Sequence, residues 1–313
     1  MGSRDYPSVN LSKPLRSVLF VPGNRPHMLD KARALPADAV ILDLEDAVPP
    51  GEKAMARSTV RQALKAAQYG PRVILRINAF GTGLAETDLR EAFVTGVDAV
   101  CLPKADTASD VEQLGSLLAN LEQERDLPVG AVGILLMVET VRGVLNAYGM
   151  ARAGQAHGGR RVQALCLGGE DLAWDLGAVR SKVGTEIAYA RAHLVFAARA
   201  AGAVAIDTVY TDLTDADGLL AEARQARQLG YGGKLLIHPA QIEPAHQAFA
   251  PSEEEVAHAR RVLEAFEEAG AWGEGVIALD GQMIDAPVVA RAREVLMMTD
   301  LSLHENPSTP HGL

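Results

Sequence analysis

The feature that most constrains the fold of this chain is a repeated alternation of short apolar runs with longer segments of helical spacing. Each run is rich in Val, Ile, Leu or Ala, as a strand buried on both faces is. The strand-like runs are Ser17–Val21, Val40–Leu44, Val73–Ile77, Ala99–Pro103, Val132–Val138, Ala164–Leu167, Ala203–Val209 and Lys234–Ile237. Alternating strands and helices give parallel strands joined by right-handed crossovers, and eight such units predict a closed (β/α)8 TIM barrel.

An open, doubly wound sheet is the alternative α/β architecture. It is disfavoured because no Gly-x-Gly-x-x-Gly motif follows the first strand-like run. We therefore expect residues 1–250 to form one barrel domain that carries the catalytic site.

The chain continues well beyond the eighth predicted strand. Pro251–Gly270 has the pattern of a helix capped by Ser252, Gly273–Asp285 that of a β-hairpin, and Pro287 begins another predicted helix. A closed barrel does not need this segment for its own core. We expect residues 251–313 to form a C-terminal lid that covers the active-site rim, that of a neighbouring subunit in particular.

Composition limits the classes of partner. The net charge of −10 argues against nucleic acid, although a few local arginines could still hold a small anion. The two cysteines, Cys101 and Cys166, lie in apolar runs, so we expect them to be buried core residues in a reducing compartment. The N-terminal residues lack a signal core and no apolar run is as long as a membrane span, which predicts a cytoplasmic protein without a membrane partner.

Two carboxylates stand at neighbouring predicted strand ends. Glu139 directly follows the fifth run, and Asp171 follows the sixth. Adjacent strands lie about 4.8 Å apart, so both side chains could share one ion, and an all-carboxylate site favours Mg²⁺. The alternative for each acid alone is a helix N-terminal residue stabilised by the helix dipole, which is less favoured for the two acids together.

The second run ends in three acids, and the third contains an arginine. Arg76 lies among apolar residues, where its charge must be paired. The two-residue period of a strand places Asp43 and Glu45 on one face and Asp46 on the other. We expect Glu45 and Asp46 to orient metal-bound water or to pair with Arg76, and Asp43 to stabilise the barrel.

Two further polar residues allow more than one interpretation. Lys104 ends the fourth run, where a lysine could form a Schiff base with a carbonyl substrate. The acids around it favour an ion pair instead. His238 follows the eighth run and is expected to be structural rather than to contact substrate.

Motifs along most of the chain, from Arg16 to Met298, resemble those of the citrate lyase β-subunit family, the CitE-like part of the HpcH/HpaI aldolase superfamily. The motifs are RSVLFVPGNRP, DLEDAVPP, LRIN, MVET, GGEDLAWDLG, DTVYTD, IHPAQI and GQMIDAPVV. The family includes malyl-CoA and citramalyl-CoA lyases, a thioesterase and a malate synthase.

The resemblance implies a homo-oligomeric barrel, trimeric or hexameric, that uses Mg²⁺ to cleave a 3-hydroxyacyl thioester. The products would be an acetyl thioester and a 2-oxo acid, such as oxaloacetate from a citryl thioester. By the same resemblance Glu139 and Asp171 would bind Mg²⁺ and Arg76 would bind the thioester carbonyl. Asp285 would be the acid/base that reaches into a neighbouring subunit's site.

The resemblance and the strand-end positions also give a set of expected substrate-binding residues. Some would lie near the thioester or the CoA phosphates, and two backbone amides at a helix N-terminus would bind a substrate carboxylate. The set is Arg16, Asn24, Arg25, Asn78, Lys104, Gly168 and Gly169.

Several functions remain open at this point. A malyl-CoA thioesterase, a malate synthase or an aldolase of free hydroxy-oxo acids could use the same scaffold. The chain could also be the β subunit of a citrate lyase complex, acting on a citryl group bound to a carrier protein. A non-catalytic scaffold is disfavoured because the metal carboxylates, Arg76 and Asp285 are all present. The sequence does not distinguish citramalyl-CoA, malyl-CoA and citryl thioesters, since a methyl group contributes only ~1–3 kcal/mol of selectivity.

Overall fold

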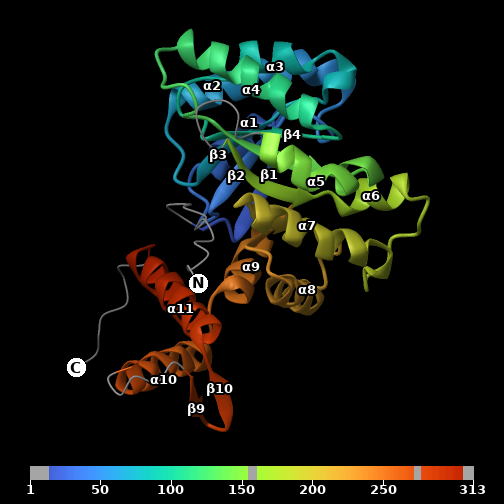
Figure 1. Cartoon of the computed structure of the whole chain (residues 1–313). Helices are drawn as coiled ribbons and strands as arrows, with labels where there is room; N and C mark the ends of the chain where they lie inside the picture. Colours follow the sequence, from blue (N-terminus) through green and yellow to red (C-terminus); the bar gives the residue numbers. More distant parts are fainter. Residues whose placement is uncertain (1–13, 154–160, 271–275, 306–313) are drawn as a thin grey trace. The chain divides into compact units, whose positions relative to one another are not determined.

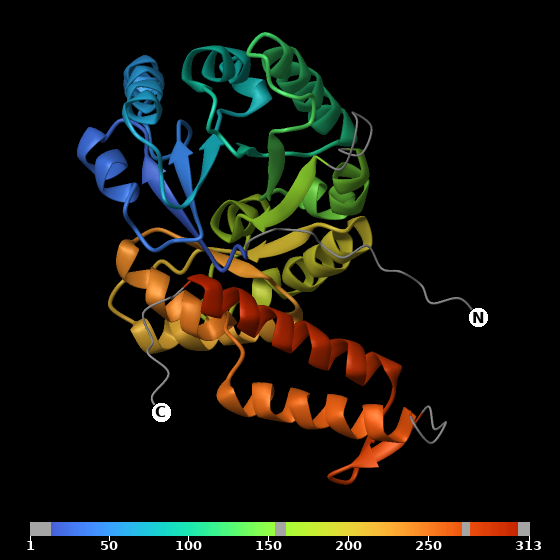
Figure 2. The same ribbon diagram turned by 90° about the vertical axis from the view of Figure 1, so that its left-hand side faces the viewer.

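The computed structural model describes residues 14–153, 161–270 and 276–305. Its central feature is a closed barrel of parallel strands in sequential order, surrounded by helices (Figures 1 and 2). The strands are β1 (Ser17–Pro22), β2 (Ala39–Asp43), β3 (Arg72–Arg76), β4 (Ala99–Leu102), β5 (Gly133–Val138), β6 (Val162–Leu167), β7 (Val204–Asp207) and β8 (Gly233–Leu236). The predicted (β/α)8 TIM barrel is confirmed.

Helices connect successive strands and cover the outside of the barrel. They are α1 (Pro26–Ala32), α2 (Lys53–Ala66), α3 (Ala85–Ala92), α4 (Ala108–Gln123), α5 (Val141–Ala153), α6 (Gly169–Asp175), α7 (Ala188–Ala201), α8 (Ala216–Leu229) and α9 (Ile242–Phe249). Helix α4 begins directly after Thr107, whose side chain forms a capping box with Asp110. Within the described ranges, no helix combines the length and hydropathy needed to cross a bilayer.

The core has two layers. One fills the barrel interior and includes Ile41, Ile74 and both cysteines; the other, larger layer lies between the strands and the helices. Cys101 and Cys166 are completely buried, and burial raises the pKa of both thiols. Their prediction as core residues is confirmed, and a thiol with a raised pKa is a poor nucleophile.

Strand register brings the polar strand ends together. Asp43 pairs with Arg76 where β2 and β3 end, and Val138 pairs with Leu167 where β5 and β6 end. Glu139 and Gly168 follow those last two positions directly. The carboxyl ends of the strands therefore carry the polar residues, as is usual for barrel enzymes.

The chain divides into two compact units between Phe249 and Ala250. The second unit contains α10 (Glu253–Gly270), the antiparallel strands β9 (Ile277–Leu279) and β10 (Gln282–Ile284), and α11 (Ala286–Glu305). Residues 273–275, the start of the predicted hairpin, lie outside the described residues. The second unit has its own apolar core, in which Val262 and Ile284 are buried. Its function as a lid stays a prediction.

Candidate active site

Glu139 is a buried carboxylate at the carboxyl end of the barrel, directly after β5. It is 2% exposed, and its Oε1 accepts a hydrogen bond of 2.8 Å from the backbone amide of Lys104. Its pKa is raised to about 8, chiefly by burial and also by the nearby carboxylates of Glu45 and Asp171, against the opposing effect of the positive charge on Lys104. A bound cation would offset this unfavourable charge.

Asp171 lies in the first turn of α6 and is half-buried. The turn that leads to it packs tightly on Glu139, because a Cβ at Gly168 would lie 2.5 Å from the Glu139 Cβ and 2.6 Å from its Oε2. Only glycine fits there. The structure thus brings Glu139 and Asp171 together, as the strand-end positions predicted.

The two carboxylates fit the predicted Mg²⁺ site. Neither Glu139 Oε2 nor the Asp171 carboxylate makes a hydrogen bond within the described part of the chain, which leaves oxygens available as ligands. No group of three or more His, Cys, Asp or Glu side chains suited to a metal occurs among the described residues. Mg²⁺ suits a site with few protein ligands because it retains water and takes oxygens from substrate.

Arg76 is held rigidly at the end of β3. Its Nε and Nη2 donate to the two carboxylate oxygens of Asp43 at 2.7 and 2.6 Å, and its guanidinium lies 4.6 Å from the centre of the Phe20 ring. Burial lowers the pKa of Arg76, but the paired Asp43 outweighs this effect and raises it, so the side chain stays charged. Asp43 also accepts the amides of Glu45 and Ala47. Asp43 is therefore the main partner of Arg76, in addition to its expected structural role.

Glu45 joins Arg76 to Lys104. Its Oε2 lies 3.1 Å from Arg76 Nη1, an ion-pair distance without hydrogen-bond geometry, and its Oε1 accepts a 2.5 Å hydrogen bond from Lys104 Nζ. Asp46 is more exposed and lies 3.9 Å from Arg76 Nη1 and 3.6 Å from Lys104 Nζ. The expectation that these two acids pair with Arg76 is met for Glu45 and, at longer range, for Asp46.

Lys104 has the features of a charged residue rather than of a Schiff-base nucleophile. Burial lowers its pKa, but the hydrogen bond with Glu45 and the charge of Glu139 raise it well above its ordinary value. A Schiff base requires the neutral amine, so this geometry favours the ion pair over the class I aldolase alternative. Lys104 also has a left-handed backbone, with φ of 50°, which directs its amide to Glu139.

The turn after β1 contains two of the expected substrate-binding residues. Asn24 is buried, its Nδ2 donates to Glu52, and its Oδ1 has no hydrogen-bond partner among the residues that the structure describes. The side chain of Arg25 is exposed. Both lie at the same end of the barrel as Glu139, so both remain candidates for binding a substrate.

Arg16 lies at the wrong end of the barrel for its predicted role. It precedes β1 and forms a bidentate pair with Asp38, which precedes β2, at 2.9 and 2.8 Å. The amino ends of parallel strands lie opposite the rim that carries Glu139. The structure therefore contradicts a contact between Arg16 and substrate bound at Glu139, and assigns Arg16 to pairing with Asp38.

Asn78 also differs from its prediction. It is buried, and its Nδ2 donates to the Leu44 carbonyl at 2.9 Å and to Asp88 at 2.6 Å. Its backbone amide donates to Asp88 as well. These bonds join β2, β3 and α3, and they favour a structural role over the predicted binding of substrate.

The amides of Gly168 and Gly169 do not point to a substrate carboxylate. The Gly168 amide donates to the Val138 carbonyl at 3.0 Å, and the Gly169 amide donates to Thr208 Oγ1 at 2.9 Å. Both donors are used inside the barrel, so the prediction that they bind a carboxylate is wrong. Sequence inspection could not detect these bonds because they depend on strand register.

Asp285 and His238 make local hydrogen bonds. Asp285 is half-buried, and its Oδ1 accepts from the amide of Val288 at 3.3 Å in the first turn of α11. His238 Nδ1 accepts from the amide of Ala240, in agreement with the expected structural role. Since Asp285 belongs to the second unit, its predicted acid/base role stays a proposal.

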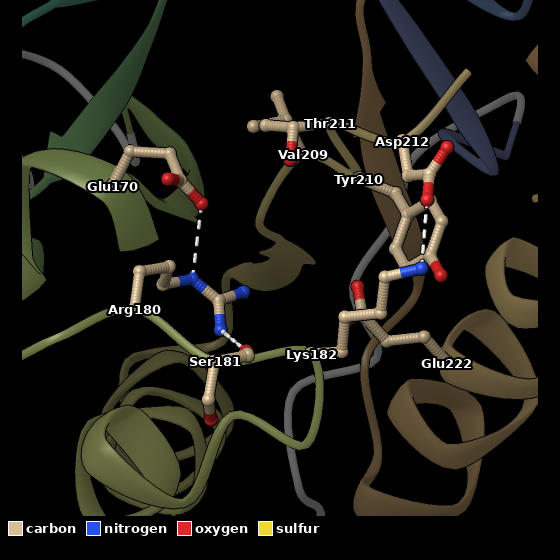
Figure 3. A pocket seen from close by; sticks show the side chains of 9 residues that line it. All are labelled: Glu170, Arg180, Ser181, Lys182, Val209, Tyr210, Thr211, Asp212 and Glu222. Atoms are coloured by element: carbon tan, nitrogen blue, oxygen red, sulfur yellow. Dashed lines mark hydrogen bonds and ion pairs between the residues drawn. The ribbon is translucent and has the colours of Figure 1, made fainter. Parts of the chain in front are cut away.

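A cavity of about 120 Å³ lies next to α6, among segments that follow β6 and β7 (Figure 3). Its cationic side chains are already paired. Arg180 contacts Glu170 and Glu186 at 3.0 and 2.8 Å, and Lys182 contacts Asp212 at 2.7 Å. Neither Glu139 nor Asp171 lines this cavity, and its balanced charges do not form a separate anion site.

Comparison with known proteins agrees with this geometry. Residues 16–239 match the family model described as HpcH/HpaI aldolase/citrate lyase. The chain belongs to this family. The predicted resemblance is confirmed, and with it an enzyme of the lyase class.

Curated members of the HpcH/HpaI family align over nearly the whole chain. The citrate lyase subunit beta of Leuconostoc mesenteroides subsp. cremoris is 40% identical over 286 residues, which cover 91% of this chain and 93% of that protein. A (3S)-malyl-CoA thioesterase of Cereibacter sphaeroides is 39% identical over 284 residues, which cover 90% and 94% respectively. The family relationship therefore includes proteins with two different reactions.

Solved structures from the same family are also similar. The CitE protein of Mycobacterium tuberculosis in complex with magnesium, acetoacetate and coenzyme A is 34% identical, with a TM-score of 0.77; the match covers 93% of this chain and 100% of that one. A citrate lyase beta subunit of M. tuberculosis with oxaloacetate and magnesium is 33% identical, with a TM-score of 0.64 and coverage of 77% and 100%. Both of these structures were solved in complex with magnesium.

Proposed function

We propose that this protein is a Mg²⁺-dependent carbon–carbon lyase that cleaves a 3-hydroxyacyl thioester into an acetyl thioester and a 2-oxo acid. The observation that carries the proposal is the meeting of two kinds of group at one rim of the barrel. Arg76 is a rigid, permanently charged donor, and Glu139 and Asp171 are carboxylates with oxygens free for a cation. The citramalyl, malyl and citryl thioesters each contain a thioester oxygen that could accept from Arg76, and a carboxylate and a hydroxyl that could bind the cation.

Cleavage requires three changes in the substrate. A general base, for which Asp285 of a neighbouring subunit is our candidate, takes the proton of the 3-hydroxyl. The bond between the second and third carbons of the acyl chain then breaks, and its electron pair moves to the thioester oxygen as an enolate. The protonated base returns a proton to the enolate carbon and so gives the acetyl thioester. Mg²⁺ held by Glu139 and Asp171 would supply Lewis-acid polarisation of the oxygens of the 2-oxo acid. Stabilisation of the enolate and binding of the rest of the substrate depend on side chains of the protein.

Arg76 is suited to stabilise the enolate. Asp43 uses the Nε donor and one Nη2 donor, and Nη1 lies 3.1 Å from Glu45 without a hydrogen bond, so N–H groups of the two Nη atoms remain for the thioester oxygen. A preorganised charged donor in a buried site stabilises developing negative charge without reorganisation. Lys104 supplies a second fixed positive charge beside Glu45 and Glu139, and Asn24 Oδ1 is a free acceptor for a substrate amide or hydroxyl.

A thioesterase is the second candidate, because the curated relatives include (3S)-malyl-CoA thioesterases at 39% identity. The test incubates the purified protein and Mg²⁺ with citramalyl-CoA, malyl-CoA and citryl-CoA, and measures free thiol and 2-oxo acid separately. A lyase releases 2-oxo acid without free CoA, whereas a thioesterase releases free CoA. Absence of turnover with every CoA ester would contradict a free-standing CoA enzyme and favour the β subunit of a complex acting on a carrier-bound citryl group.

We also propose that the protein self-associates, with Asp285 of one subunit acting at the site of another. Large apolar side chains are exposed on α5, α6 and α7, which form one side of the barrel, and α5 packs on α7 (Figure 1). Among them Trp174 is 83% exposed, Phe196 76% and Tyr189 64%. Exposed aromatic residues gathered on one face are typical of protein interfaces.

Mixed oligomers test the sharing of Asp285. Arg76→Lys and Asp285→Ala chains are each expected to have little activity, and co-refolded mixtures are expected to regain part of it. Recovery follows because some sites would combine an intact Arg76 from one chain with an intact Asp285 from another. Specific activity against mixing ratio is the measurement. Mixtures that form oligomers but regain no activity would contradict a shared site.

A further inference from the structure

A buried side chain outside the proposed metal site holds the turn that carries Asp171. Thr208 follows β7, is fully buried, and accepts the amide of Gly169 through its Oγ1 at 2.9 Å. Gly169 fits closely there, since a Cβ at this position would lie 2.7 Å from Thr208 Oγ1 and 3.1 Å from Ile187 Cδ1. The turn before Asp171 is therefore held directly against β7.

Thr208 is itself fixed by a buried charge network. Lys234 Nζ donates to the Thr208 carbonyl at 2.7 Å, to Asp207 Oδ2 at 3.0 Å and to Glu222 Oε1 at 2.5 Å. Arg191 pairs with Asp207 through two bonds of 3.1 and 2.9 Å. All three Lys234 protons are used, so the network is a rigid anchor rather than a source of a free amine.

The other side of the same turn is held by the strand that carries Glu139. The Gly168 amide donates to the Val138 carbonyl, and Gly168 packs on the Glu139 side chain. The two glycines thus lie between Glu139 and Asp171 in the chain fold, with Gly168 hydrogen-bonded to Val138 and Gly169 hydrogen-bonded to Thr208. Their two hydrogen bonds hold the turn after β6 to β5 and to the end of β7, between these two carboxylates.

We infer that Thr208 is a positioning residue that sets the separation of the Glu139 and Asp171 carboxylates for a divalent cation. The inference rests on the proposed function, because it takes these two residues as the metal ligands. Groups that orient metal ligands typically change metal affinity ~10–100-fold when they are removed. A hydroxyl that only filled the core would affect folding stability and leave cation affinity unchanged.

Thr208→Val tests the inference because it keeps the shape of the side chain and removes the hydroxyl. Mn²⁺ serves as a probe that also prefers carboxylate oxygens, and free Mn²⁺ is measured by electron paramagnetic resonance on the full chain without substrate. Thr208→Val is expected to bind Mn²⁺ ~10–100-fold more weakly, and Thr208→Ser, which restores the hydroxyl, within about threefold of the unsubstituted protein. Gly169→Ala, which displaces the same hydrogen bond from the other side, is expected to weaken binding as well.

Thr107→Val is the matched control. The Thr107 hydroxyl caps α4 at the same end of the barrel, so its loss is expected to lower thermal stability without changing Mn²⁺ affinity. Unchanged affinity in Thr208→Val and Gly169→Ala, or equal weakening in Thr107→Val, would overturn the inference. If Thr208→Val does not fold, the Mn²⁺ affinities of Gly169→Ala and Thr208→Ser decide whether this hydrogen bond positions the carboxylates. Failure of the unsubstituted protein to bind Mn²⁺ would instead overturn the proposed metal site, and the inference with it.

Discussion

Glu139→Gln is expected to reduce Mg²⁺-dependent turnover ~10²–10³-fold, because a metal ion contributes several kcal/mol of transition-state stabilisation. The substitution preserves the shape of the side chain and the acceptor for the Lys104 amide. It removes the negative charge that would hold the cation. The measurement is turnover against Mg²⁺ concentration, using the CoA ester that the unsubstituted protein cleaves fastest.

We also expect Glu139→Gln to change how the free energy of unfolding depends on pH. Since the pKa of Glu139 in the folded, metal-free protein is about 8, the folded state keeps a proton that the unfolded chain has lost above about pH 4.5. The metal-free protein should therefore lose stability as pH rises from about 4.5 to about 8. Because glutamine does not titrate, the free energy of unfolding of Glu139→Gln should not fall over this pH range. By pH 8 this effect should amount to a difference on the order of a few kcal/mol between the two proteins. Urea denaturation in a chelator, at several pH values, measures it.

Glu122→Gln provides a control with the opposite sign. Glu122 is also buried, but its pKa is lowered, against the effect of burial, by Arg161 and by the amides of Gly130 and Val132. Replacing it should reduce stability at neutral pH and leave the Mg²⁺ dependence of turnover unchanged. A Glu139→Gln enzyme with full activity and normal Mg²⁺ dependence would show that Glu139 is not a metal ligand.

The barrel and the position of Glu139 and Asp171 at its carboxyl rim could be predicted because both depend on short-range patterns. Buried parallel strands appear as apolar runs, and the residue after each run lies at the carboxyl rim, so Glu139 and Asp171 follow from strand ends alone. Arg76 was expected to require a partner because a buried charge must be paired.

The errors concern interactions between segments far apart in the sequence. Arg16 precedes its strand by one residue, so its side chain lies at the amino end, where Asp38 pairs with it. The Gly169 amide was assigned to substrate because the sequence does not show that Thr208 lies beside it. In the sequence, Thr208 differs from other threonines only by its position in the DTVYTD motif, so its contact with Gly169 could not be predicted. The second unit has a pattern that predicts its helices, but no pattern that determines where Asp285 acts.

The second large effect is expected at Arg76, where the choice of substitution matters. Arg76→Ala would leave the buried carboxylate of Asp43 without its cation and would remove one of the two cations beside Glu45, and breaking a buried pair in this way typically costs ~3–5 kcal/mol of stability. Lysine keeps a positive charge but cannot form the bidentate pair with Asp43 or present a second donor in a fixed direction. Arg76→Lys therefore separates the loss of the preorganised guanidinium from the loss of charge.

Arg76→Lys is expected to lower kcat ~10²–10³-fold, as loss of one oxyanion-stabilising donor does. KM should change little and Mn²⁺ affinity not at all, because Arg76 stabilises charge that develops on the thioester oxygen and does not hold the cation. Arg161→Lys is the matched control, since Arg161 forms a buried bidentate pair with Glu122 at the amino end of the barrel; it should lose stability and retain kcat. A kcat for Arg76→Lys within threefold of the original would exclude Arg76 as the enolate's donor. Weakened Mn²⁺ binding would show instead that Arg76 acts by positioning the metal carboxylates.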